Sequence, residues 1–380
     1  MRSVTWHLGL IRPAGAVALL LGLALAVGGC RRRQGDEGQQ GGDGTTTAGD
    51  TADAPLPEPG PPPEDWPRVL VVGPGAGPAL YLGPEDDAPA VGYLNPGVRI
   101  RMETSFVNDR VEVLVAGALA TKGWIPTRRL AAYAQQRGRV EGTRAYLGPN
   151  DLVTVLGPAD AENMRVEVRP WLGGGNYLEQ SFVGTFPREQ LADRPVDEAE
   201  VEDVSEGECY RLPAGETVPV YESPRDPPIV SLPVLDPPLP VVVLIERGEW
   251  KGIRAGYGPY LTGYVDADLT PCEGSLPTPE PAVPAGEEGR PYWMTQESGP
   301  LHRVADGTRI RFHDETIARL RADGWARELG RQGDDMVDVF VAVNDQVALR
   351  GLVSADSLTL VEGEDNSAPA EGSETEEEEA

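Results

Sequence analysis

Short runs in which apolar and polar residues alternate recur along this chain, and they predict β-strands. In residues 110–115, Val111, Val113 and Val115 alternate with Arg110 and Glu112. Period-two alternation of this kind is typical of a strand with one buried face. After a polar connection the run leads to a glycine, an aromatic or aliphatic residue and, a few positions later, a leucine. We interpret this pair of segments as one β unit.

The unit occurs four times. Its strand runs are 110–115, 164–169, 250–254 and 336–341, and its closing phrases are Gly123-Trp-Ile-Pro-Thr-Arg-Arg-Leu130, Gly184-Thr-Phe-Pro-Arg-Glu-Gln-Leu191, Gly263-Tyr-Val-Asp-Ala-Asp-Leu269 and Gly351-Leu-Val-Ser-Ala-Asp-Ser-Leu358. Tyr-Leu-Gly-Pro at 81–84 and 146–149 predicts equivalent positions in the first two units. The similar phrases at 97–101 and 307–311 predict the same for the first and fourth units. Ile317 and Leu320 predict one or two helical turns within 314–330.

The closing phrases resemble those of bacterial SH3-like (SH3b) domains, over roughly residues 68–361 in four pieces. The resemblance implies an all-β chain of about four tandem small SH3-like β barrels. Repeated hairpins in a sandwich are the alternative. The expected divisions are a signal peptide at 1–29, an anchor and disordered Gly/Pro-rich linker at 30–66, repeats at 67–134, 139–193, 208–274 and 291–361, linkers at 194–207 and 275–290, and a disordered acidic tail at 362–380.

The N-terminus has a basic start and an apolar run from Ala14 to Val27 that is short for a membrane span. Its ending, Val27-Gly-Gly-Cys30, resembles a bacterial lipobox. That resemblance implies cleavage before Cys30, acylation of Cys30, and a lipid-anchored protein of the cell membrane or outer membrane that faces the periplasm or exterior. The alternatives are an ordinary secretory peptide in which the Cys occurs by chance, and an uncleaved anchor of opposite orientation, which the positive charges of Arg31 to Arg33 favour.

The composition limits the partners. The formal net charge is −28, which opposes binding to nucleic acid because Lys and Arg neutralise phosphates. The 46 Gly and 37 Pro indicate many turns and linkers. We therefore expect no nucleic-acid partner and a better electrostatic fit to a basic protein.

The sequence predicts no catalytic set, no metal site and no cofactor, and hence no enzyme. His302 and His313 are the two histidines after the predicted cleavage site, and neither lies near a recognisable nucleophile. Cys209 and Cys272 lie at the two edges of the third unit, where the first and last strands of a small barrel are neighbours. We expect a disulfide between them, since export permits one.

Two aromatic residues, Trp171 and Tyr177, flank a Gly-rich tip and are the candidate binding residues, because binding sites often use exposed aromatic side chains. The alternative is that both fold back on the core of their own unit. By resemblance the expected function is binding of an envelope protein or cell-wall peptide. A non-binding spacer or assembly subunit of an envelope complex is the alternative. The sequence does not specify an oligomeric state.

Overall fold

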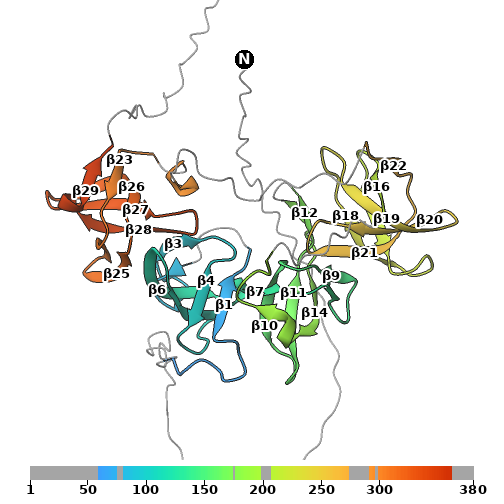
Figure 1. Ribbon diagram of the computed structural model, residues 1–380, viewed down its shortest axis with the longest axis horizontal. Helices are drawn as coiled ribbons and strands as arrows, with labels where there is room; N and C mark the ends of the chain where they lie inside the picture. The colour runs from blue at the N-terminus through green and yellow to red at the C-terminus, as the bar shows by residue number, and fades with distance from the viewer. Residues whose placement is uncertain are drawn as a thin grey trace, which may run out of the picture. The chain divides into compact units, whose positions relative to one another are not determined.

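The computed structural model describes residues 59–74, 80–173, 176–197, 207–273, 291–295 and 298–361 (Figure 1). Over these residues the regular elements are β-strands and short 3₁₀-helices, which confirms the all-β prediction. The predicted signal peptide, Cys30, most of the linkers and the acidic tail lie outside the described residues. In the described ranges there is no helix with the length and apolar character needed to cross a membrane.

The first unit folds around an apolar entry strand. Its strands are β1 (Val69–Val72), β2 (Leu80–Tyr81), β3 (Ala90–Leu94), β4 (Arg99–Met102), β5 (Arg110–Val115), β6 (Leu119–Pro126) and β7 (Leu130–Ala134). Hydrogen bonding orders them β7-β1-β4-β5-β6-β2-β3. The predicted strand run and closing phrase are therefore β5 and β6, paired as neighbours.

The same order recurs in the third and fourth units. The third has β16 (Glu208–Arg211), β17 (Val218–Tyr221), β18 (Pro228–Leu232), β19 (Pro240–Arg247), β20 (Trp250–Ala255), β21 (Tyr260–Val265) and β22 (Thr270–Pro271). The fourth has β23 (Leu301–Val304), β24 (Arg309–Phe312), β25 (Glu315–Leu320), β26 (Gly324–Gln332), β27 (Met336–Ala342), β28 (Val347–Ser354) and β29 (Leu358–Leu360). Their orders are β22-β16-β19-β20-β21-β17-β18 and β29-β23-β26-β27-β28-β24-β25. Both are barrel-like sheets.

The second unit shares a strand with the first. Its strands are β8 (Gly138–Arg139), β9 (Ala145–Leu147), β10 (Leu152–Pro158), β11 (Asn163–Val168), β12 (Trp171–Gly173), β13 (Asn176–Tyr177), β14 (Phe182–Pro187) and β15 (Leu191–Ala192). Strand β7 pairs with β1 of the first unit and with β10 and β15 of the second. One strand thus ends the first sheet and begins the next.

Each closing phrase forms a strand whose glycine lies against a hairpin; we call β6, β14, β21 and β28 the glycine strands. A Cβ on Gly123 would stand 2.9 Å from the carbonyl oxygen of Tyr81, and one on Gly351 2.6 Å from that of Arg311. A Cβ on Gly263 would stand 2.8 Å from the Tyr221 carbonyl oxygen, and one on Gly184 would clash with that of Glu141. A side chain would block this approach, so the recurring glycine has a packing reason.

The phrase Tyr-Leu-Gly-Pro does not occupy equivalent positions, so that prediction was wrong. Tyr81 pairs with Trp124 in the inner strand of the hairpin of the first unit. Tyr146 instead belongs to β9, the outer strand of the hairpin of the second unit, and pairs with Tyr260. Leu-Gly-Pro follows both strands as a turn, and a turn sequence does not specify which strands it joins.

Two other predictions, which concern the fourth unit, were also wrong. Residues 97–101 lead into β4, which pairs with β1 and β5, whereas 307–311 lead into β24, a hairpin strand. Alternating Arg and Ile residues suit any strand with one buried face, so the shared phrase does not determine which strands pair with it. Residues 314–330 form strands β25 and β26 rather than helical turns, because Ala318 and Leu320, two apart, are the buried pair.

We call the outer hairpin strands β3, β9, β18 and β25 the outer strands, and three of them join one unit to another. Strand β3 pairs with β28, β25 with β6, and β9 with β21. The first and fourth units therefore exchange outer strands reciprocally, although they are far apart in sequence. A second apolar cluster, comprising Met294, Leu301, Trp325, Phe340, Ala342 and Ala348 with Tyr93 packed on it, forms where these two units meet.

Candidate binding sites

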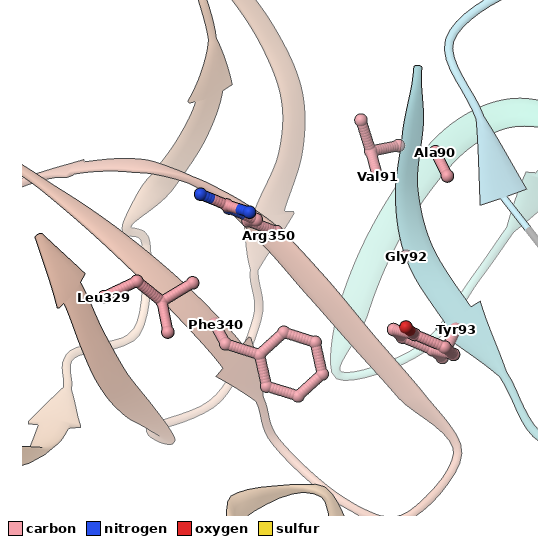
Figure 2. A pocket seen from close by; sticks show the side chains of 7 residues that line it. All are labelled: Ala90, Val91, Gly92, Tyr93, Leu329, Phe340 and Arg350. Atoms are coloured by element: carbon pink, nitrogen blue, oxygen red, sulfur yellow. The ribbon is translucent and has the colours of Figure 1, made fainter. Parts of the chain in front are cut away.

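A pocket with a volume of about 390 Å³ lies where strand β3 meets the fourth unit (Figure 2). Residues 90–93 of β3 form one wall, and Leu329, Phe340 and Arg350 come from β26, β27 and β28. Figure 2 shows the rings of Tyr93 and Phe340 beside the same space, with the Arg350 side chain at its border. We call this site the β3 hollow.

Close strand pairing holds the two walls together. Tyr93 pairs with Ala348 and Gly92 with Leu349. A Cβ on Gly92 would lie 2.7 Å from the Ala348 carbonyl oxygen, so only glycine allows β3 to approach this far. The register thereby fixes the Tyr93 ring against the fourth unit.

Aromatic contacts then orient the rings. The Tyr93 ring lies 6.0 Å from Phe340, edge to face, and 5.4 Å from Trp293. Trp293 donates its indole N–H to the carbonyl oxygen of Asp345, at 3.2 Å. Ring pairs at these separations stabilise the fold by about 0.5–1.5 kcal/mol beyond the effect of buried area. The walls of the β3 hollow are therefore formed without a ligand.

Arg350 lines the β3 hollow beside the Tyr93 and Phe340 rings. The Arg350 guanidinium donates to the Asp338 carboxylate at 2.8 Å, and 60% of its side chain remains exposed. An arginine can hold a second carboxylate while it keeps the first, because the guanidinium has five N–H donors. The β3 hollow suits an apolar side chain beside a carboxylate.

The sequence does not predict the β3 hollow, because its walls come from units far apart in the chain. Tyr93 and Phe340 each lie in an ordinary alternating strand, and no local pattern relates them. The only available signal was Gly92, a glycine inside a strand, since such glycines often mark a close approach of another backbone.

Trp171 and Tyr177 lie elsewhere, in the small β12–β13 hairpin, where they pair with each other. The backbone of Trp171 exchanges hydrogen bonds with the loop of the third unit: its N–H donates to Pro259 and its carbonyl accepts from Tyr257. The rings of Trp171 and Tyr257 are 5.9 Å apart. Tyr177 is 37% exposed and remains a candidate contact residue, while Trp171 is positioned between units.

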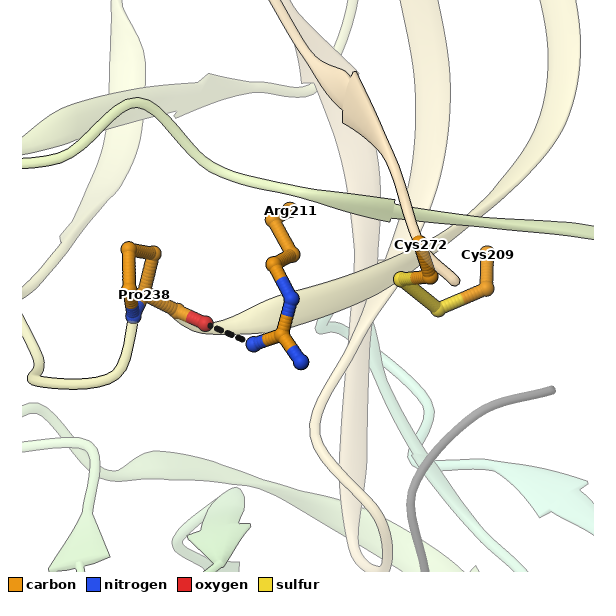
Figure 3. Close-up of a disulfide and its surroundings, with 4 residues drawn as sticks. All are labelled: Cys209, Arg211, Pro238 and Cys272. Atoms are coloured by element: carbon orange, nitrogen blue, oxygen red, sulfur yellow. Dashed lines mark hydrogen bonds between the residues drawn. A yellow bond between two sulfur atoms is a disulfide. The ribbon is translucent and has the colours of Figure 1, made fainter. Parts of the chain in front are cut away.

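Cys209 and Cys272 form the predicted disulfide (Figure 3). Their Cα atoms are 5.3 Å apart, and the backbone N–H of Cys272 donates to the carbonyl oxygen of Cys209 at 2.9 Å. The bond connects first strand β16 with the segment after last strand β22. Arg211, on β16, also donates to the carbonyl oxygen of Pro238 at 3.0 Å, which holds the loop before β19 against this strand.

Neither histidine assembles a recognisable catalytic group in the described ranges. His302 is buried, with its Nε2 3.0 Å from a carboxylate oxygen of Glu328. A hydrogen bond from Arg331, with a smaller contribution from His302, holds the pKa of Glu328 below its ordinary value. His313 is exposed at the β24–β25 turn. The described residues contain no group of three or more His, Cys, Asp and Glu side chains that could hold a metal ion.

Asp151 is the carboxyl group with the most altered environment among those described. It accepts a hydrogen bond from the backbone N–H of Gly148 at 2.6 Å and contacts Gly258 of the third unit. Burial raises its pKa to about 7, which the Gly148 hydrogen bond only partly opposes. Tyr260, whose own pKa is raised by burial, lies close enough to feel the Asp151 charge, together with Arg137, Arg254 and Tyr146.

We predict that this group makes stability depend on pH. Because the folded pKa of Asp151 exceeds the unfolded one, its contribution is fully present below about pH 4 and is lost as the pH rises to about 7. Asp151→Asn should remove this decrease in the free energy of unfolding. At pH 8 the variant should be more stable than the parent by on the order of 1–2 kcal/mol, a modest gain because the Asp151 side chain keeps partial contact with water. Urea unfolding at several pH values measures the difference.

The control is Asp160→Asn in the same unit, because Asp160 is fully exposed and its pKa is lowered by hydrogen bonds from Asn163 and Glu162. That variant should keep the decline between pH 4 and 7. An Asp151→Asn protein with the same decline as the parent would contradict the assignment.

Comparison with known proteins gives no relative from which to transfer a function. No family model, no curated protein and no solved structure matches the chain.

Proposed function

We propose that this chain is a lipid-anchored cell-envelope binding protein in which four SH3-like repeats bind an envelope protein or a cell-wall peptide. The recurring strand order and the glycine strands support the SH3-like assignment. The lipobox-like ending at Cys30 supports the anchor. Acyl mass on Cys30, measured on protein from membranes, tests the anchor separately from the binding.

The β3 hollow is the observation that carries the binding proposal. Its walls are fixed by strand pairing and by aromatic contacts, so a ligand finds it already formed. The apolar rings and Arg350 fit a peptide residue with a carboxylate nearby. The net charge of −28 disfavours polyanions as the main partner, so we prefer a protein or peptide.

Charge reversal at the rim tests this proposal. Arg350→Glu should weaken capture of the partner from envelope extract at least about tenfold, because charge-assisted hydrogen bonds are worth roughly 1.5–3 kcal/mol. The readout is a titration of immobilised full-length protein against solubilised envelope proteins and, separately, against soluble cell-wall peptides.

Arg101→Glu is the matched control. Arg101 is 57% exposed and pairs with Glu103 at 2.7 Å, as Arg350 pairs with Asp338, but it does not line the β3 hollow. Equal binding by the two variants, with both folded, would contradict the assignment of the β3 hollow. Retention of glycan strands alone, without any protein or peptide, would contradict the partner class.

The second candidate function is a structural spacer or assembly subunit. The three strand pairings between units favour it, because they make the units a continuous scaffold rather than beads on a flexible chain. Co-purification with a larger complex at fixed stoichiometry, unchanged by Arg350→Glu, would favour this function over ligand binding.

A further inference from the structure

Three outer strands dock on three glycine strands in one register. At the centre of each contact, Tyr93, Tyr146 or Arg319 of the outer strand faces the residue three positions before the closing glycine of the other unit, which is Ala348, Tyr260 or Ala120. The next pair is equivalent as well: Gly92, Ala145 and Ala318 face Leu349, Leu261 and Thr121. Docking in this chain therefore follows a rule.

The hydrogen bonds also follow the rule. Asn95 donates its N–H to Gln346, Arg321 to Ala118 and Thr262 to Arg144. Each of these bonds lies two residues from the central pair of its contact. Antiparallel pairs alternate between hydrogen-bonded and non-bonded, so all three central pairs are hydrogen-bonded ones.

One outer strand and one glycine strand are left over in the described part of the chain. Strand β18 has a described pairing only with β17, and β14 only with β11 and, through Thr185, with Glu141. The edge of β14 that precedes Gly184 thus lacks the strand that the other three glycine strands have.

Strand β18 has the features of a docking strand. Its Leu232 is buried, as are Leu94, Leu147 and Leu320 at the same place in the other outer strands. Ser231, the central residue, pairs with Pro219 on its inner side. Proline has no N–H to donate, so this pair is a non-bonded one and the N–H and carbonyl of Ser231 point outward.

Exposed apolar residues accompany both free edges. Val183, on β14, is 44% exposed, and Val234, just after β18, is 48% exposed. Prolines flank β18 at 227 and 233, as they flank the docked strand β3 at 89 and 96. Proline at the ends of an edge strand does not prevent its centre from pairing, as β3 demonstrates.

We propose that β18 of one molecule docks on β14 of a second copy of this chain. Following the rule, Ser231 pairs with Ser181 and Val230 with Phe182. The partner is another molecule because, within one chain, β9 joins the second unit to the third and leaves both edges unpaired. Two reciprocal contacts between two copies close a dimer, and this holds whatever ligand the β3 hollow binds.

The contact is weaker than the three within the chain. The outer strand has Gly92, Ala145 or Ala318 next to the central pair of each contact within the chain, whereas β18 has the larger Val230 at this position. A Cβ at Gly92 would clash with Leu349, so the larger Val230 leaves less room for a partner strand. Self-association is therefore reversible and depends on concentration.

The experiment is sedimentation equilibrium of the full-length chain in density-matched detergent, up to about 100 μM, a range that detects micromolar contacts. The parent should self-associate. Ser231→Pro removes the outward N–H of β18, and Ser181→Pro removes that of β14, so each variant alone should associate at least tenfold more weakly. The alanine variants Ser231→Ala and Ser181→Ala keep the N–H and should behave as the parent does.

Mixing separates docking from misfolding. Ser181→Pro keeps an intact β18 and Ser231→Pro keeps an intact β14, so a mixture of the two can form 1:1 heterodimers through one of the two contacts. The mixture should therefore associate more weakly than the parent and more strongly than either variant alone. A parent that stays monomeric throughout, proline variants that associate as the parent does, or a mixture that associates no more than either variant alone would each overturn the proposal.

Discussion

Replacing both Cys209 and Cys272 by serine should lower the free energy of unfolding of the third unit by about 4 kcal/mol. The bridge joins positions 63 residues apart, and closing a loop of that size restricts the unfolded chain by roughly this amount. The last strand of the unit, β22, contributes only Thr270 and Pro271 to the sheet, and both are exposed. Little else holds this strand on β16.

Hydrogen exchange of the full-length chain measures the effect, because amides of β16, β19 and β20 should lose protection by the same free energy. Reducing the disulfide of the parent protein should give the same loss as the double serine variant. Unchanged protection in both would show that the bridge does not stabilise the unit, whereas loss only in the serine variant would implicate side-chain packing.

Gly351→Ala should destabilise the fourth unit by about 3 kcal/mol, at the upper end of the cost of overpacking a close contact. The added methyl would lie 2.6 Å from the carbonyl oxygen of Arg311 and 2.6 Å from Ile310, so β24 must move off β28. Because β3 also docks on β28, the β3 hollow should lose its shape as well. Urea unfolding with tryptophan fluorescence measures the change.

Gly330→Ala is the matched control in the same unit. No atom lies within 4 Å of the position its methyl would take, so it should be neutral or slightly stabilising by restricting the unfolded chain. Equal effects of the two substitutions would show that the loss comes from strand propensity and not from the close approach at Gly351.

Local pattern predicted the strands that were most regular. Residues 110–115 and 336–341 alternate cleanly and form β5 and β27, and each closing glycine lies on the strand that pairs next to such a run. The disulfide followed from the positions of Cys209 and Cys272 at the edges of one unit. These features depend on contacts within one unit, and the local alternation of apolar and polar residues reflects such contacts.

Pairing between units could not be predicted in this way. Tyr146 and Tyr81 share a phrase but lie on different hairpin strands, because the hairpin of the second unit is shorter than that of the first. Trp171 contacts Tyr257 of the third unit, which the sequence does not relate to it. The β3 hollow depends on the register of β3 against β28, which comes from tertiary docking and not from the residues of either strand alone.

Strand β7 belongs to the sheets of the first and second units at once, so the chain cannot be divided there without loss to one of them. Its five residues, Leu130–Ala134, pair with β1 of the first unit and with β10 and β15 of the second. A truncation after residue 134 leaves β7 without β10 and β15, and one before residue 130 removes β7 from both units. Engineering of this region must therefore keep the first two units together, whereas the third unit has a separate entry strand.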